Sequence, residues 1–134
     1  MTLTYGKLLA AFIVLRKIGA PVPPAPPYML KSCARVAIAR NMRRIMEACK
    51  DSAEEEDRIT ARQVAAAQTK DEVALAKAVK EKEELRAQEI EVLISKLTVE
   101  NLNLDVNQIS TDDLLALEPI CPGLLDDGGA TPKA

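Results

Sequence analysis

Histidine and tryptophan are absent from this 134-residue chain. Histidine is the commonest general base, the commonest zinc ligand and the usual switch near neutral pH, so its absence argues against all three roles. Aromatic residues are also few, namely Tyr5, Phe12 and Tyr28. Because aromatic side chains supply much of the buried area in compact cores, their scarcity predicts helices that pack through aliphatic side chains.

Cysteine is scarce as well, with Cys33, Cys49 and Cys121 and no C-x-x-C spacing. Three cysteines cannot all pair within one molecule, so we expect reduced thiols in a cytoplasmic protein. The sequence also lacks a Gly-rich phosphate loop, a nucleophile elbow and a metal-spaced cluster. We therefore predict that the protein is not an enzyme and that it uses no cofactor and no metal.

Long hydrophobic runs are missing too. The most apolar stretch, 8–15, is about half the ~20 residues that a membrane-spanning helix needs. Arg16 and Lys17 end this stretch, and no small-x-small cleavage site follows them. We expect a buried helix here, and a chain with no membrane association.

Helix-breaking residues are concentrated in a few places. Residues 28–118 contain neither Gly nor Pro and are rich in Ala, Glu, Lys and Leu, which predicts mostly helix. Prolines fill five of the seven positions 21–27, which predicts a stiff connector, although such runs also dock SH3-like grooves. Apolar spacings of three and four residues predict a helix over 6–18 that Gly19 ends.

The sequence as a whole predicts a mainly α fold, either a helical hairpin or a small bundle with a long charged helix. Capping boxes at Thr69 and Ser110 mark a possible break and the start of a short helix, and the alternation at 102–106 indicates a strand-like arm that could pair with residues 2–5. We expect one domain, 1–122. Its elements are a helix at 6–18, a connector at 20–27, a helix at about 27–50, a long helix at about 53–98 with a possible break near 69, an arm at 101–107 and a helix at 111–118; a disordered tail follows at 123–134.

Charge is divided unequally along the chain. Residues 1–50 hold nine Lys and Arg residues and one acid, Glu47, whereas residues 51–134 hold nine basic residues and nineteen acids. A basic segment and an acidic segment attract each other within a molecule or between copies, which favours antiparallel or head-to-tail packing. This pattern predicts an interaction or assembly protein.

The best candidate anion site is a group of four arginines that we expect one helix to present together: Arg35, Arg40, Arg43 and Arg44. Their expected target is the acidic run 54–57 of the same or a neighbouring chain, with a small anionic ligand as an alternative. Nucleic acid is disfavoured, because the chain has a net charge of −2 and matches no nucleic-acid reader motif.

The candidate self-association surface is the apolar side of the N-terminal helix, made of Leu8, Leu9, Phe12, Ile13 and Leu15. We expect a homo-oligomer that forms through these side chains, with the basic and acidic helices setting the register by complementary charge.

The order of parts also carries a resemblance. An N-terminal Leu-Thr-Tyr-Gly-Lys-Leu-Leu-Ala-Ala-Phe helix, a proline turn, Tyr28-Met29-Leu30-Lys31 and a closing segment 109–120 follow one another. This layout is similar to that of small helical proteins of unassigned function encoded by tailed bacteriophages and prophages. The resemblance implies a role in particle assembly, with a virion protein as partner. Alternatively it implies an inhibitor or adaptor that binds a host defence protein in the bacterial cytoplasm. Apart from the resemblance, the arginines leave open an oligomer that sequesters an anionic nucleotide on them. The five prolines and the Arg-rich second helix depart from that layout, and the resemblance assigns no site residues.

Overall fold

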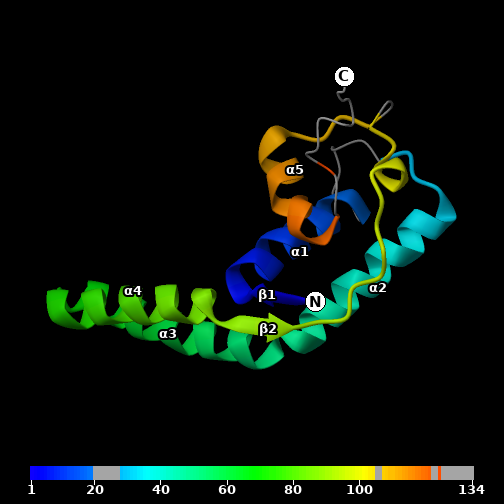
Figure 1. Ribbon diagram of the computed structural model, residues 1–134. Coiled ribbons are helices and arrows are strands. Elements are labelled where there is room, and N and C mark those ends of the chain that lie inside the picture. The colour runs from blue at the N-terminus through cyan, green and yellow to red at the C-terminus, as the bar shows by residue number, and fades with distance from the viewer. Residues whose placement is uncertain (20–27, 105–106, 122–123, 125–134) are drawn as a thin grey trace, which may run out of the picture.

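The computed structural model describes residues 1–19, 28–104, 107–121 and 124, and it confirms a mainly helical fold (Figure 1). The elements are β1 (Thr2–Thr4), α1 (Tyr5–Gly19), α2 (Ser32–Ala48), α3 (Lys50–Gln68), α4 (Glu72–Ala87), β2 (Glu89–Glu91), a 3₁₀ helix (Glu100–Leu102), α5 (Thr111–Leu117) and a second 3₁₀ helix (Glu118–Ile120). Helices α2 and α3 follow one another as a long bent stretch, and α4 folds back along α3. Helices α1 and α5 lie on the inner side of the bend.

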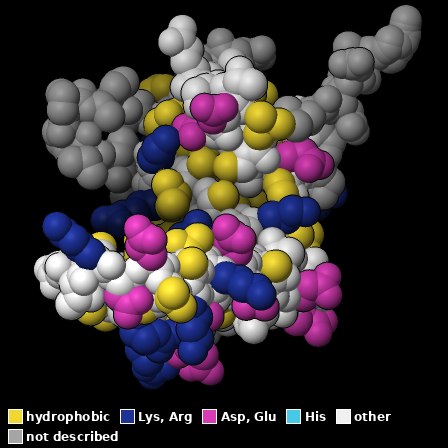
Figure 2. Space-filling model, turned by 90° about the vertical axis from the view of Figure 1, so that its left-hand side faces the viewer, with side chains coloured by type: hydrophobic (Ala, Val, Ile, Leu, Met, Phe, Trp, Pro, Cys, Tyr) yellow, Lys and Arg dark blue, Asp and Glu magenta, His cyan; other side chains and the backbone are white. Residues whose placement is uncertain are grey.

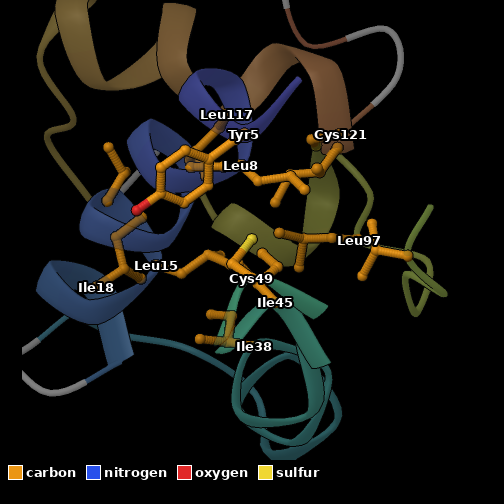
Figure 3. Close-up of a cluster of buried hydrophobic side chains, with 14 of the residues drawn as sticks. Tyr5, Leu8, Leu15, Ile18, Ile38, Ile45, Cys49, Leu97, Leu117 and Cys121 are labelled. Atoms are coloured by element: carbon orange, nitrogen blue, oxygen red, sulfur yellow. The ribbon is translucent and has the colours of Figure 1, made fainter. Parts of the chain in front are cut away.

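Helix α1 occupies the segment where the sequence predicts a helix, and it supplies the centre of the core. Its buried side chains recur at three- and four-residue spacings, as in Leu8, Ala11 and Leu15. Figure 3 shows Leu8 and Leu15 between Ile38 of α2 and Leu117 of α5. The core is built mainly from aliphatic side chains, as the scarcity of aromatic residues predicts.

Helix α2 begins later than predicted, at Ser32 rather than near residue 27. The preceding backbone is extended, because Met29 is held by a residue far along the chain. The side chain of Asn107 accepts a hydrogen bond from the Met29 N–H at 2.8 Å and donates one to the Met29 carbonyl at 3.1 Å. Long-range hydrogen bonds of this kind leave no signal in local periodicity.

The predicted break near residue 69 is present, and it makes a helical hairpin of α3 and α4. Lys70 has a left-handed backbone with φ 57°, which ends α3. The Thr69 hydroxyl donates to the Ala65 carbonyl at 3.1 Å, so Thr69 belongs to the end of α3. The Asp71 carboxylate accepts the Ala74 N–H at 3.1 Å and caps the start of α4.

The long helix predicted over about 53–98 starts close to where expected, but its predicted C-terminal end is wrong. It begins at Lys50, and its second half ends at Ala87. Residues Glu89–Glu91 instead form β2, which pairs antiparallel with β1 so that Ile90 lies opposite Leu3. The pairing predicted between 2–5 and 102–106 is therefore also wrong.

The prediction of a strand-like arm at 101–107 is also wrong for the described part of that segment, and its residues 105–106 lie outside the described ranges. Residues Glu100–Leu102 form a 3₁₀ helix, and Asn103 follows in a left-handed conformation with φ 51°. Helix α5 lies where the sequence predicts a short helix. The Ser110 hydroxyl accepts the Asp113 N–H at 3.2 Å as its cap.

Two predicted segments lie outside the described residues: the connector at 20–27 and most of the tail at 123–134. Leu124 is the exception within the tail. It is partly buried and packs against the core.

Candidate interaction surface

The apolar surface predicted for self-association is mostly internal. Leu8 and Leu15 are completely buried, and Leu9 and Phe12 are partly buried against the same core. Of the five side chains, only Ile13 is substantially exposed, at 51%. The prediction fails because α2, α5 and α4 pack against α1 within one chain. The apolar side of α1 is therefore buried against other elements of the same chain.

The four predicted arginines do not form one cluster. Arg35 and Arg44 are nine residues apart, which at about 100° per residue places them on opposite sides of α2. The Arg35 guanidinium donates at 3.4 Å to two carbonyls of the chain before the helix, those of Tyr28 and Leu30. Arg40 and Arg43 remain on the solvent side of α2, and both are exposed.

Arg44 has a structural role that its residue type did not indicate. Its Nη1 donates to the Ser95 Oγ at 2.8 Å. Beside it, the buried Asn41 accepts the Ser95 N–H at 2.6 Å and donates to the Ser95 carbonyl at 3.0 Å. Asn41 thus satisfies both backbone groups of Ser95 and fixes the segment after β2 against α2. The sequence offered one signal that we did not use, a lone Asn at a core position of an apolar stripe.

The buried and exposed sides of α2 continue directly into those of α3. The Cys49 N–H donates to the Ile45 carbonyl at 2.9 Å, and the Ala53 N–H donates to the Cys49 carbonyl at 2.8 Å. Because these bonds keep the helical i to i−4 pattern across Cys49, the buried sides of both helices stay in phase. The buried side chains of this inner face are Ala34, Ile38, Asn41, Ile45, Cys49 and Ile59.

The opposite side of α2 and α3, which we call the outer face, carries charged residues of both signs. Six of its exposed charged residues are Arg40, Arg43, Glu47, Lys50, Glu54 and Asp57. The basic residues lie mainly in α2 and the acidic ones mainly in α3. Met46 and Val36 add exposed apolar area on the solvent side of α2, with 60% and 47% of their surface accessible.

Within the described part of the chain, none of these six charged groups takes part in an ion pair. The ion pairs there join Lys17 to Asp113, Arg58 to Glu55, Arg62 to Glu81 and Arg86 to Glu56. The predicted pairing of the arginines with acids 54–57 of the same chain is therefore not formed by the described residues. Two of those acids, Glu55 and Glu56, have other partners, at 2.9 and 2.7 Å.

The hairpin of α3 and α4 is a second exposed region. Its buried side chains include the small Ala66 and Ala78, and it exposes Val64, Val73 and Val79. Figure 2 looks toward the tip of the hairpin and shows hydrophobic side chains in the seam below the rest of the molecule, with both charge signs around them. A cleft of about 370 Å³ lies elsewhere, beside Lys31 and the first 3₁₀ helix, and none of the four arginines lines it.

The two buried thiols, Cys49 and Cys121, are less readily ionised than a free cysteine. Burial raises the pKa of the Cys49 thiol, and burial with the nearby Glu100 carboxylate raises the pKa of the Cys121 thiol to about 11.

The described residues contain no group of three or more acidic, Cys or His side chains placed to hold a metal ion. No helix in the described ranges has the length and apolar character that a bilayer crossing requires.

Comparison with known proteins finds no relative, since no family model, no curated protein and no solved structure matches the chain. A functional proposal for this protein therefore starts from its own residues. The outer face of α2 and α3 is one surface whose six charges have no ion-pair partner among the described residues.

Proposed function

We propose that this protein is a non-catalytic interaction protein that associates with itself through the outer face of α2 and α3. The observation that supports this function is the set of six exposed charges along a continuous helical surface, which are mainly basic in α2 and mainly acidic in α3. None of them has an ion-pair partner among the described residues. Charge of both signs in two adjacent blocks is suited to a partner that carries the complementary blocks in the reverse order.

A second copy of the chain is such a partner. A purely acidic partner would be attracted by Arg40 and Arg43 but repelled by Glu54 and Asp57, and a basic partner would meet the opposite problem. A second copy that runs antiparallel offers acids to the basic block and bases to the acidic block at the same time. The association surface is thus the outer face of α2 and α3 rather than the apolar side of α1, and complementary charge still sets the register.

The association should be weak and should depend strongly on salt. Exposed ion pairs each contribute little, about 0.2–1 kcal/mol, and screening shortens their range from about 10 Å at 0.1 M salt to about 3 Å at 1 M. Met46 contributes a flexible apolar side chain to the same surface. The stability of the fold itself does not depend on this contact, because the core is closed within one chain.

Reversal of charge on the outer face tests the proposal. The Arg40→Glu, Arg43→Glu double variant should raise the dimer dissociation constant by at least about tenfold at low salt, since the attractive contacts of both positions become repulsive in both copies. The measurement is sedimentation equilibrium. The matched control is Lys77→Glu with Lys80→Glu, which makes the same charge change at the same spacing on the exposed side of α4. Equal effects of the two variants would show that net charge, not the outer face, governs association.

A second candidate function is binding to a host protein as an adaptor or inhibitor, and the protruding hairpin favours it. The hairpin exposes Val64 and Val73, with 51% and 82% of their surface accessible. The resemblance to phage-encoded proteins supplies a setting for such a partner. A Val64→Ser, Val73→Ser variant should lose a host protein that co-purifies with the wild type while it keeps its own mass in solution. Retention of the same partner by that variant would contradict this role for the hairpin.

A further inference from the structure

We infer that the two copies pair antiparallel in one specific register, with the two-fold axis passing between Ala48 and Cys49. This inference rests on the proposed self-association and specifies its geometry. The register places three kinds of contact across the interface, each of opposite charge and each occurring twice. The pairs are Glu47 with Lys50, Arg43 with Glu54, and Arg40 with Asp57 of the second copy.

Neighbouring registers are worse. A shift by one helical turn in one direction places Glu47 against Glu47 at the axis, and a shift in the other direction places Lys50 against Lys50. A parallel arrangement would place Arg40 and Arg43 against themselves along the whole basic block. Like charges that face each other directly are destabilising, so the sequence of signs along the outer face selects one arrangement among these.

The shape of the bend decides how far the contact extends. Helices α2 and α3 curve around α1, so the outer face is convex and two copies approach most closely where α2 meets α3 (Figure 1). At a rise of about 1.5 Å per residue, Arg43 and Glu54 lie about 8 Å from the axis, and Arg40 and Asp57 about 13 Å. Long arginine side chains suit the outer positions, where the two surfaces diverge. A contact of this length is smaller than a standard interface, which agrees with weak association.

Mixing two single variants tests the register. Arg43→Glu alone places Glu against Glu54 in its own dimer, and Glu54→Arg alone places Arg against Arg43, so each should dissociate at least about tenfold more readily than the wild type. In an equimolar mixture, both contacts become attractive again without any second change in either chain. The mixture should therefore sediment as a dimer at about 50 mM salt, where each variant alone is largely monomeric.

The control mixture combines Arg43→Glu with Asp57→Arg. These two positions do not face each other in the inferred register, so this mixture should stay largely monomeric. If both mixtures dimerise equally, net charge neutralisation explains the result and the register is wrong. If the wild type dimerises and neither Arg43→Glu nor Glu54→Arg weakens it, the register is wrong while self-association stands. A wild type that is monomeric at every salt concentration would overturn the proposed function itself.

Discussion

The two faces of α2 and α3 are made from the same helices but have opposite relations to the rest of the molecule. On the inner face, apolar side chains such as Ile38 are buried, and the polar Asn41 finds two hydrogen-bond partners on Ser95. On the outer face, six charged side chains are exposed and have no ion-pair partner among the described residues. The inner face of the two helices therefore contributes to the core, whereas the charges of the outer face are exposed to solvent.

The largest expected effect contrasts the two faces directly. Ile38→Ala should lower the free energy of unfolding by about 3 kcal/mol, because Ile38 is 1% exposed and its removal leaves a cavity beside α1. Val36→Ala, two residues away on the outer face, should change it by less than about 0.5 kcal/mol. Urea denaturation of both variants measures the difference. Similar losses at the two positions would break the distinction between the faces.

A smaller effect is expected at Asn41. Asn41→Ala should cost about 2 kcal/mol of stability, because the N–H and carbonyl of Ser95 lose their partners at a partly buried position. The neighbouring Arg40→Ala should cost less than about 0.5 kcal/mol, since Arg40 is exposed. Thermal unfolding measures both. A loss in Asn41→Ala no larger than in Arg40→Ala would show that these hydrogen bonds do not hold the segment in place.

The sequence could predict the helical class but not which elements cover one another. Apolar periodicity and caps such as Ser110 are local, so they located α1, the turn near 69 and α5. Strand β2 was missed because 28–118 contains no helix breaker, although Ile90 and Val92 alternate with Glu89 and Glu91 in the manner of a strand. Its partner β1 is more than 80 residues away in the sequence, and local patterns cannot show that two such distant segments pair.

The candidate site shows the same limit. The split of charge along the chain did indicate the basic block in α2 and the acidic block in α3. The sequence groups Arg44 with Arg40 and Arg43, because nothing in it indicates that Ser95 lies within hydrogen-bond distance of Arg44. It also assigned self-association to Leu8 and Leu15, because an amphipathic helix looks the same whether its cover comes from its own chain or from another.

The hydrogen bond between Tyr5 and Glu56 on the inner side of α3 should make the stability of the fold depend on pH, by about 1 kcal/mol. The Tyr5 hydroxyl donates to Glu56 Oε1 at 3.0 Å, and burial with this carboxylate raises the pKa of Tyr5 to about 12. In the unfolded chain Tyr5 ionises near pH 10, so the folded state holds the proton more tightly and stability should fall as the pH rises from about 10 to about 12.

Tyr5→Phe tests this dependence. The variant should lose about 1 kcal/mol at neutral pH, where the hydrogen bond is intact in the wild type. The difference from the wild type should shrink as the pH rises through about 10 to about 12, because the wild type loses its advantage when Tyr5 ionises. Urea denaturation across this range measures the trend. A constant difference would contradict the raised pKa of Tyr5.

The smallest effect is expected for the exposed ion pair that links the two helices of the hairpin. Arg62 and Glu81 meet at 3.2 Å, and both side chains keep a third or more of their surface accessible. Glu81→Gln should therefore change the free energy of unfolding by less than about 0.5 kcal/mol in denaturant titrations. A loss above about 1 kcal/mol would show that this surface pair, unlike those of a typical exposed helix, stabilises the hairpin substantially.

The most direct test of self-association is the absolute mass of the wild-type protein in solution, measured by light scattering on a sizing column at about 50 and about 500 mM salt. Association through the outer face predicts the mass of two chains at the lower salt concentration and a shift toward one chain of 14.6 kDa at the higher one. A single-chain mass under both conditions, at protein concentrations up to the millimolar range, would contradict it.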